Sequence, residues 1–567
     1  MTESLTATTD KPWAVSAARI GWAVLIVATL YVCYFSHLGT LGFVGPDEPR
    51  YAWIARDMAE TGDWVTPRLY GKPWFEKPPL LYWGAAICFK PFGVSETTAR
   101  LPSAISALFA TLALAWLALR LYGAETARWL LLLLPTTVGM IGFSHAAATD
   151  MPFSGMLTVA MVCAAVVVGL TRNRNTPILA RTPWLALILF GFFLGLALLA
   201  KGPAAIILCG GAVLFWSVFT KRWREAFRLL HPAAILAFCL TALPWYILCA
   251  RRNPDFFRIF IVEHNFKRFL TPEFQHIQPF WYFGPILLLA LLPWTPAFAW
   301  VVVARGMRAL REKTLSPNAT FVCSWMAFCL VFFSISRSKL PGYILPAIPP
   351  AALLFTRGLV TVTPRNRRLF GEVIAALGLL LLFAVELVGA TRIHAVRNSG
   401  PVLFALSRIL LSLAIPNLLL GLGFVLWTIR RFQNTCLALA IASLTCFLFF
   451  ADTILRNLQP IYGTQKELAL QLVALGVPPE RIFEYLAVDR STRYALNFYL
   501  HREIPNWDES SRVEAFVISG SIDCGRLKTR GYDCEEISLG YPAVGWYVSH
   551  VTAKTSVSDA ASSGQPK

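Results

Sequence analysis

Charged side chains are scarce in this sequence. Asp, Glu, Lys and Arg make up 15% of the 567 residues, whereas hydrophobic residues make up 56% and the mean hydropathy is +0.56. Globular domains carry about 25% charged residues, so this composition excludes an ordinary water-soluble fold. Apolar runs of about 20 residues, long enough to cross a hydrocarbon core of about 30 Å, recur along most of the chain. The sequence therefore predicts a polytopic α-helical membrane protein.

Motifs for nucleotide chemistry are also missing. No phosphate-binding Gly-rich loop follows a strand and no Ser/His/Asp grouping stands out, so we expect no nucleotide cofactor. No short apolar core with a small-residue cleavage site opens the chain, so we expect the first span to be retained. Most of the 12 Cys lie in or beside apolar runs, where a small hydrophobic role is expected. Cys524 and Cys534 lie in a polar segment and would pair if it faces an oxidising compartment.

The net charge of +19 is unevenly distributed. From Pro460 onward there are 11 Lys and Arg against 13 Asp and Glu, which leaves 40 and 19 upstream of it. Nucleic-acid binding is not indicated, because it favours a continuous basic face. Basic residues instead cluster in the short connections after even-numbered apolar runs, and such connections belong in the cytoplasm. The N-terminus is therefore expected in the cytoplasm and the C-terminal segment outside, in the periplasm if the membrane is a bacterial inner membrane.

About thirteen spans are expected from the apolar runs. Their predicted centres lie near residues 27, 109, 135, 160, 192, 211, 241, 292, 326, 349, 379, 415 and 443. No internal repeat and no matched pair of broken helices is visible. The predicted organisation is a cytoplasmic N-terminus (1–16), a transmembrane catalytic domain (17–458), an outer α/β domain (459–553) and a disordered tail (554–567).

Two outer connections, 36–100 and 251–278, are too long to be simple turns, and long connections are often functional. The first contains "PRYAWIARDMAETGDW", whose apolar residues recur at helical spacing and predict an amphipathic helix on the membrane surface. The second is rich in Lys and Arg although it is expected outside. An anionic ligand would explain this placement.

Acidic residues with two interpretations occur at two outer positions. Asp47 and Glu48 in "GPDEPRY" precede a predicted helix, and Asp150 in "HAAATDMPF" precedes a predicted span. Each Asp has the form of a helix N-cap with Pro in the first turn. Each also lies at the depth where an enzyme acting on a membrane-anchored substrate needs carboxylates. The sequence alone leaves both interpretations open.

Several cations are expected on the same outer side. They occur in "FEKPPLLYW", "LLAKGPA", "EHNFKRF" and "SISRSKLPGYILP", and comprise Lys77, Lys201, Arg268, Arg337 and Lys339. Each alone is consistent with interfacial anchoring, but together with the two acids they favour a phosphate-handling site. Glu76 and His264 are a candidate pair of ligands for a divalent metal ion, although their spacing carries no zinc signature.

These motifs, in this order over about residues 17–455, resemble the GT-C membrane glycosyltransferases, and most closely the bacterial lipid A aminoarabinose transferase branch, which is related to protein O-mannosyltransferases. The resemblance implies transfer of a sugar from a polyprenyl phosphate, undecaprenyl phosphate in bacteria, to an acceptor at the periplasmic face. The most specific version moves 4-amino-4-deoxy-L-arabinose to lipid A. A related transferase that uses another sugar on protein or polysaccharide hydroxyls, and a lipid-linked sugar transporter, are the alternatives.

The resemblance also assigns expected roles to matching residues. Asp47 and Asp150 are the expected catalytic carboxylates, with Glu48 beside them. Donor or phosphate contacts are expected from Arg50, Lys77, Lys201, Arg268, Lys339 and Tyr343, and metal contacts from Glu76 and His264. Asp47 would act as a general base for a hydroxyl acceptor, whereas for an ionised phosphate acceptor it would position the acceptor through Arg50 or a metal.

Overall fold

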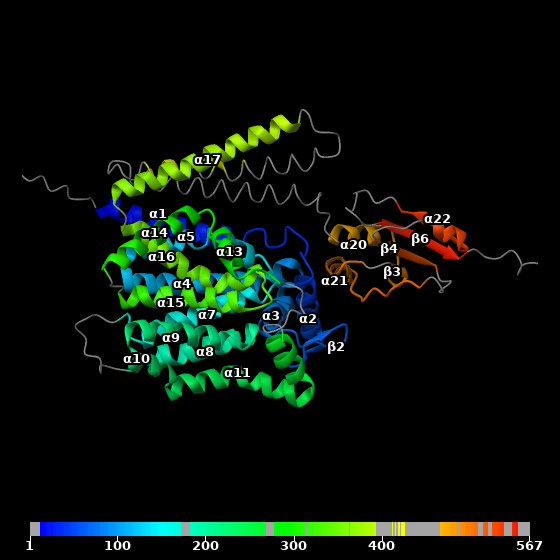
Figure 1. The fold of residues 1–567 in the computed structure, drawn as a ribbon. Helices are drawn as coiled ribbons and strands as arrows, with labels where there is room; N and C mark the ends of the chain where they lie inside the picture. The colour runs from blue at the N-terminus through cyan, green and yellow to red at the C-terminus, as the bar shows by residue number, and fades with distance from the viewer. Residues whose placement is uncertain are drawn as a thin grey trace, which may run out of the picture.

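A bundle of long helices and a small α/β domain make up the protein (Figure 1). The computed structural model describes residues 12–171, 182–267, 277–312, 316–361, 363–392, 465–485, 488–508, 514–519, 524–537 and 547–553, with a few single residues between 411 and 425. The α/β domain lies beyond one end of the bundle, and helices α2 and α3 lie at that same end. We call this end of the bundle the α2 end.

The bundle is built from helices connected in chain order. They are α1 (Pro12–Tyr34), α4 (Glu96–Tyr122), α5 (Ala124–Leu133), α6 (Val138–Ser144), α7 (Asp150–Val167), α8 (Trp184–Lys201), α9 (Ala204–Thr220), α10 (Trp223–Phe227), η1 (Arg228–Leu230), α11 (Pro232–Arg252), α13 (Phe283–Ala290), α14 (Thr295–Glu312), α15 (Pro317–Ile335), η4 (Pro341–Ala347), α16 (Ile348–Thr361) and α17 (Pro364–Arg392). Among the described residues, six helical segments are long and apolar enough to cross a membrane, or seven if the bent pair α5–α6 is one span.

The predicted spans agree with this bundle over most of the chain. The first eleven predicted centres fall on a helix, or between two consecutive helices in the cases of residues 135 and 292. The centre near 443 lies outside the described residues, and only scattered residues are described around 415. A polytopic helical fold is therefore confirmed, while the number of spans stays a prediction.

One predicted span is not a single straight helix. The apolar run centred near residue 135 forms α5 and α6, which meet at 60°. Pro135 lies in the break, where a proline removes a backbone donor and clashes with the preceding turn. Thr137 then begins the second helix, because its hydroxyl accepts a hydrogen bond from the N–H of Met140 at 3.4 Å.

Helix α7 lies at the centre of the bundle, packed between α4 and α8. Nearly all of its residues are buried, and many of them are small. A Cβ atom added to Gly155 would lie only 2.6 Å from the carbonyl oxygen of Ser106 in α4. Small residues thus let the two backbones approach closely, as is common between membrane helices. This packing fixes the N-terminal end of α7, where Asp150 lies.

The first long connection folds into α2 (Asp47–Thr61), a hairpin of β1 (Arg68–Leu69) and β2 (Lys72–Pro73), and α3 (Leu80–Phe92). The predicted amphipathic helix is confirmed as α2. It ends at Gly62, whose φ of 73° is the left-handed conformation typical of a helix C-cap. Its apolar face packs on α3, because Ile54 and Tyr82 belong to one buried cluster, while its position on a membrane surface stays a prediction.

The second long connection begins where α11 ends. It contains η2 (Arg258–Lys267), a π-helix, and it leads through η3 (Phe280–Tyr282) into α13. Residues 268–276 lie outside the described residues, and Arg268 is among them. A regular helical segment in this connection was not predicted from the sequence.

The C-terminal domain contains α20 (Gln465–Ala474), η6 (Pro479–Arg481), β3 (Ile482–Glu484), α21 (Arg490–Tyr499), β4 (Ala515–Ser519), α22 (Cys524–Thr529), β5 (Tyr532–Glu536) and β6 (Tyr547–Ala553). Its sheet has the order β3-β4-β6-β5, with β3 parallel to β4 and the other pairs antiparallel. The predicted α/β character is confirmed, and Cys524 and Cys534 form a disulfide. Helix α21, which packs on α2, was not predicted.

Candidate active site at the α2 end

Asp47 and Arg50 form an ion pair within the first turn of α2. The helix begins at Asp47, its N-cap is Pro46, and no side chain caps it, so the interpretation of Asp47 as an N-cap is wrong. Its carboxylate instead accepts from the Arg50 guanidinium and remains half-exposed. Arg50 is buried and donates through Nη1 to Glu76 at 3.0 Å. The sequence spacing of three brings Asp47 and Arg50 to one face of the helix.

The charge on Arg50 is strongly favoured in this setting. Burial alone would lower its pKa, but the neighbouring carboxylates of Glu76 and Asp47 reverse the effect and the pKa is raised above its ordinary value. A fixed positive charge therefore lies between two acids at the start of α2.

Glu48 points in the opposite direction and is buried. Its carboxylate accepts hydrogen bonds from the N–H of Val44 at 2.7 Å and the N–H of Ala147 at 2.6 Å. It also accepts two from Arg100, at 3.0 and 2.8 Å. With four donors in place, this carboxylate is fully engaged in holding the backbone. These contacts hold Glu48 between the segment before α2 and the start of α7, and its catalytic role stays a prediction.

Arg100 is a site residue that the sequence interpretation missed. It lies buried near the start of α4 and donates to the carbonyl oxygens of Leu38, Leu41 and Gly42 at 2.7 to 2.9 Å. Together with Glu48 it holds the segment before α2 in place. The sequence does contain an indication of this role. Arg100 lies at the start of an apolar run, within "ARLPSA", and an arginine buried there needs several hydrogen-bond acceptors.

Asp150, Lys201 and Tyr343 form a second cluster. Asp150 begins α7, Lys201 ends α8, and their side chains form an ion pair that is largely buried. The Lys201 ammonium also lies 4.6 Å from the centre of the Tyr343 ring in η4. The N-cap residue before Asp150 makes no side-chain cap. Three segments far apart in the sequence thus meet at one point.

Glu48 links the two clusters. It is adjacent to Asp47 in α2, and its carboxylate accepts from Ala147, three residues before Asp150. The start of α2 and the start of α7 are therefore tied through one side chain. Both acids predicted from the sequence accordingly lie at the same end of the bundle, each paired with a cation.

Lys339 lies beside a cavity of about 660 Å³ near the same end. The residues that line the cavity include both apolar and polar side chains: Ile277, Gln278, Phe280, Leu330, Val331, Ser334, Ile335, Ser336, Arg337 and Lys339. The ammonium of Lys339 donates to the carbonyls of Gln278 and Ser336, and burial lowers its pKa. Arg337 is exposed. An apolar chain that ends in a phosphate suits this mixture of surfaces.

The expected roles of the remaining residues stay predictions. Lys77 is half-buried after β2, and Arg268 lies outside the described residues. Glu76 is the partner of Arg50, and the described residues contain no group of three His, Cys, Asp or Glu side chains able to hold a metal ion. A metal ion at Glu76 and His264 is therefore not confirmed and stays a prediction, and no chemical step below depends on one.

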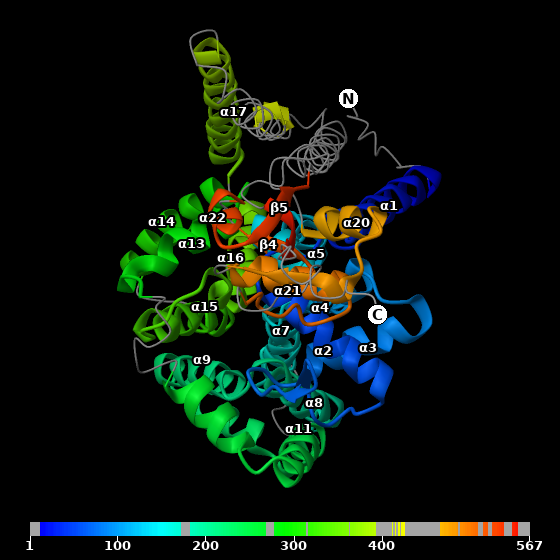
Figure 2. The ribbon, with the colours of Figure 1, turned by 90° about the vertical axis from the view of Figure 1, so that its right-hand side faces the viewer.

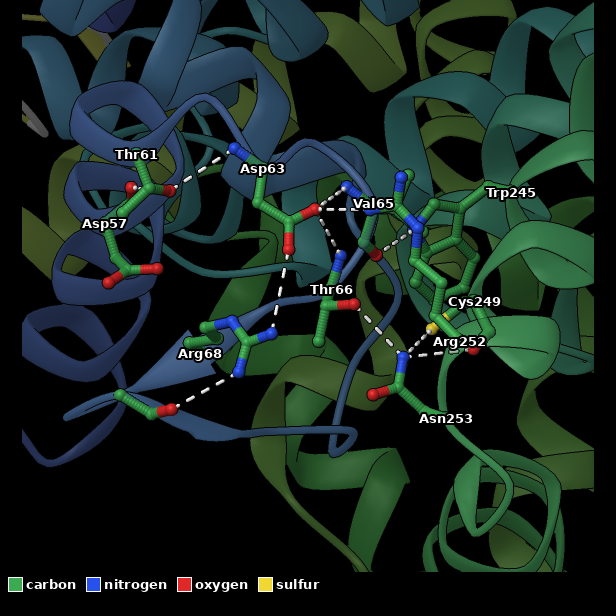
Figure 3. A network of polar contacts seen from close by, with 11 residues as sticks. Asp57, Thr61, Asp63, Val65, Thr66, Arg68, Trp245, Cys249, Arg252 and Asn253 are labelled. Carbon is green, nitrogen blue, oxygen red and sulfur yellow. Dashed lines mark hydrogen bonds and ion pairs between the residues drawn. The ribbon is translucent and has the colours of Figure 1, made fainter.

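A polar network ties the segment after α2 to the end of α11 (Figure 3). Asp63 accepts from the N–H of Thr66 at 3.2 Å and from Arg252 at 3.0 Å. Asn253 donates to the Thr66 hydroxyl at 3.1 Å and to the carbonyl of Cys249 at 3.0 Å. The first and second long connections are thus joined, so the basic segment after α11 starts from a fixed point beside α2.

Comparison with known proteins places this arrangement among lipid-dependent glycosyltransferases. Residues 20–260 match the dolichyl-phosphate-mannose-protein mannosyltransferase family. Undecaprenyl phosphate-alpha-4-amino-4-deoxy-L-arabinose arabinosyl transferase 2 of Sodalis glossinidius is 33% identical over 411 residues, which is 72% of this chain and 70% of that protein. The corresponding transferase of an Enterobacter species is 31% identical over 60% of each chain.

A solved structure has the same fold. The crystal structure of ArnT from Cupriavidus metallidurans bound to undecaprenyl phosphate superimposes with a TM-score of 0.77, over 96% of this chain and 99% of that one, at 24% identity. The helical bundle, the folded first connection and the C-terminal α/β domain therefore occur together in a known protein. The chain belongs to the family of undecaprenyl phosphate-4-amino-4-deoxy-L-arabinose arabinosyl transferases, which are membrane glycosyltransferases of the GT-C fold.

Proposed function

We propose that this protein transfers 4-amino-4-deoxy-L-arabinose from undecaprenyl phosphate to a phosphate of lipid A. The observation that carries the proposal is the pair of acid–cation clusters at the α2 end, Asp47 with Arg50 and Asp150 with Lys201, joined through Glu48. Relatives at 30% identity or more are named as arabinosyl transferases of undecaprenyl phosphate-4-amino-4-deoxy-L-arabinose, which supports the donor. The donor is lipid-linked, which agrees with the lack of nucleotide-binding motifs in the sequence.

The donor is proposed to bind where apolar surface meets fixed cations. The polyprenyl chain would lie along the apolar wall of the cavity beside Lys339, and its phosphate would meet Lys339, Lys201 and Tyr343. Lys77 and Arg268 would add to the positive charge. In a partly desolvated site, the attraction between such preorganised cations and the leaving phosphate becomes stronger as negative charge develops on that phosphate.

The reaction is a single displacement at the anomeric carbon. An acceptor oxygen forms a bond to the anomeric carbon while the bond between that carbon and the undecaprenyl phosphate oxygen breaks. The leaving phosphate keeps the electron pair. Attack opposite the leaving group inverts the configuration. An ionised phosphate acceptor brings no proton to remove, whereas a hydroxyl acceptor would give its proton to the half-exposed carboxylate of Asp47. For the lipid A acceptor, Asp47 is therefore proposed to orient Arg50.

The membrane arrangement is part of the proposal. The α2 end and the C-terminal domain would face the periplasm, with the N-terminus in the cytoplasm and the bundle in the inner membrane. The disulfide between Cys524 and Cys534 supports this orientation, because disulfides persist in oxidising compartments. The proposed domains are the cytoplasmic N-terminus 1–16, the transmembrane domain 17–458, the outer α/β domain 459–553 and the tail 554–567. Within the site, we propose that Glu48 positions both acid–cation clusters.

Purified protein in detergent tests the function directly. With a short-chain polyprenyl-phosphate aminoarabinose donor and lipid A, mass spectrometry should detect lipid A that carries the added pentosamine on a phosphate. Transfer to a protein or polysaccharide hydroxyl in place of lipid A would reassign the acceptor. An unmodified donor with every acceptor would contradict the enzyme and favour a transporter.

Gly342→Ala is expected to lower the rate constant of transfer about tenfold. The new Cβ would lie 2.7 Å from Oδ1 of Asp150 and 2.9 Å from the ring of Phe143, so the substitution should displace the Asp150 carboxylate from its present position beside Lys201. Turnover and thermal unfolding are measured together. Gly210→Ala is the matched control, because a Cβ at Gly210 meets nothing within 4 Å. Equal turnover of the two variants would contradict a role for the position of Asp150.

A further inference from the structure

Helix α21 of the C-terminal domain packs directly on α2 (Figure 2). The ring of Phe498 lies 4.8 Å from that of Phe43, in the segment that Arg100 holds before α2. Tyr499 donates through its hydroxyl to Glu96 and accepts from the N–H of Phe43, both at 2.9 Å. The C-terminal domain is therefore attached to the segment before α2 by specific side-chain contacts.

Further polar contacts fix the same interface. Arg56 of α2 donates to the carbonyl of Phe498 at 3.3 Å and contacts Nδ1 of His501 at 3.0 Å. Lys466 of α20 pairs with Glu96 of α4 at 2.8 Å. Side chains of the domain thus meet both α2 and the start of α4, so its orientation over the α2 end is determined at several separate points.

One side chain of α21 reaches the proposed site itself. The half-buried ring of Tyr494 has its centre 5.1 Å from the guanidinium carbon of Arg50. Two other rings surround the same guanidinium, Trp74 at 5.6 Å and Tyr51 at 5.8 Å, and both belong to the first long connection. Tyr494 is the nearest of the three rings, and it comes from a different domain.

We propose that the C-terminal domain completes the active site and that Tyr494 is the positioning residue through which it acts. The ring of Tyr494 holds the guanidinium of Arg50 against Asp47 and Glu76. This inference rests on the proposed function, because it assigns Tyr494 a role in the same transfer. Tyr494 contacts Arg50, so its effect on transfer would pass through Arg50.

The physical reason lies in the competition between water and the carboxylates for Arg50. A guanidinium next to an aromatic face is stabilised by the ring quadrupole, more so where water is excluded. Without the ring, water would reach the guanidinium and the side chain would gain rotameric freedom. Asp47 would then lose its fixed partner. The Arg50 side chain would adopt several conformations, and only one of them would orient the acceptor.

Two substitutions of Tyr494 test the inference in the full-length protein. Tyr494→Ala is expected to lower kcat/KM about tenfold, whereas Tyr494→Phe, which keeps the ring, retains at least about half of the wild-type value. Arg481→Ala is the control within the same domain, since Arg481 is exposed and pairs with Glu514 there. It should leave turnover unchanged. Thermal unfolding of each variant separates misfolding from loss of positioning.

A double-mutant cycle with Arg50→Lys then identifies the route of the effect. If Tyr494 acts through Arg50, Tyr494→Ala should lower kcat/KM by less than about twofold in a protein that already carries Arg50→Lys. Equal costs in both backgrounds, or wild-type turnover of Tyr494→Ala alone, would overturn the inference. The wild-type protein serves as reference in each assay. Absence of transfer by the wild type would instead count against the proposed function.

Discussion

Asp47→Asn is expected to lower the rate of transfer at least about a hundredfold while the protein remains folded. The substitution keeps the shape of the side chain but removes the charge that pairs with Arg50. The Asp47 carboxylate is half-exposed, and the buried Arg50 guanidinium keeps its second partner Glu76 at 3.0 Å, so stability should change little. Turnover with a short-chain donor and thermal unfolding in detergent measure the two effects separately.

The same variant decides how Asp47 acts. If the carboxylate removes a proton, the wild-type rate should show an acid limb that disappears in Asp47→Asn. If it only orients Arg50, the pH profile should keep its shape and fall in height. Glu372→Gln is the control, because it removes a carboxylate charge from an exposed Arg–Glu pair on α17, within one helix. A rate for Asp47→Asn above about a tenth of the wild-type value would contradict either role.

The bundle was predictable because apolar runs report membrane crossing directly. Nearly every residue of a span must be apolar, so the signal is local and needs no knowledge of neighbours. The bend between α5 and α6 shows the limit of that signal. Pro135 marks the break in the sequence, but neighbouring helices often accommodate a proline within a straight span. The angle is therefore a property of packing.

The site was predictable where its residues are close in sequence or in a recognisable motif. Asp47 and Arg50 are three residues apart in a predicted helix, so their contact follows from helical geometry. Asp150 and Lys201 were each singled out, but nothing local indicates that they pair, because they are 51 residues apart. Their contact depends on how α7 and α8 pack.

The contacts behind the proposed roles of Glu48 and Tyr494 could not be predicted from local patterns. Glu48 has an acidic neighbour and resembles a second catalytic carboxylate, yet its partner Arg100 is 52 residues away. Tyr494 belongs to a segment with no recognisable motif and reaches Arg50 from a separate domain. Residues whose function is to position others carry a signal only in the tertiary structure.

Arg100→Ala is expected to destabilise the protein by about 3–5 kcal/mol and to abolish transfer. Both members of the Arg100–Glu48 pair are nearly inaccessible, so removal of the guanidinium leaves a buried carboxylate without its counter-charge. The carbonyl oxygens of Leu38, Leu41 and Gly42 lose their donors in the same step. Thermal unfolding followed by tryptophan fluorescence measures the loss.

Arg120→Ala is the matched control for this prediction, since Arg120 is exposed near the C-terminal end of the same helix. It should leave the unfolding temperature nearly unchanged. The double variant Arg100→Met/Glu48→Met separates charge from position, because replacing a whole buried ion pair by apolar side chains is often neutral for stability. It should recover only the part of the stability that depends on charge, because the backbone groups that Arg100 and Glu48 satisfy stay without partners. It should not recover transfer, since the segment before α2 and the start of α7 would still lack the contacts that hold Asp47 and Asp150 together. Recovery of both properties would contradict the positioning role of the pair.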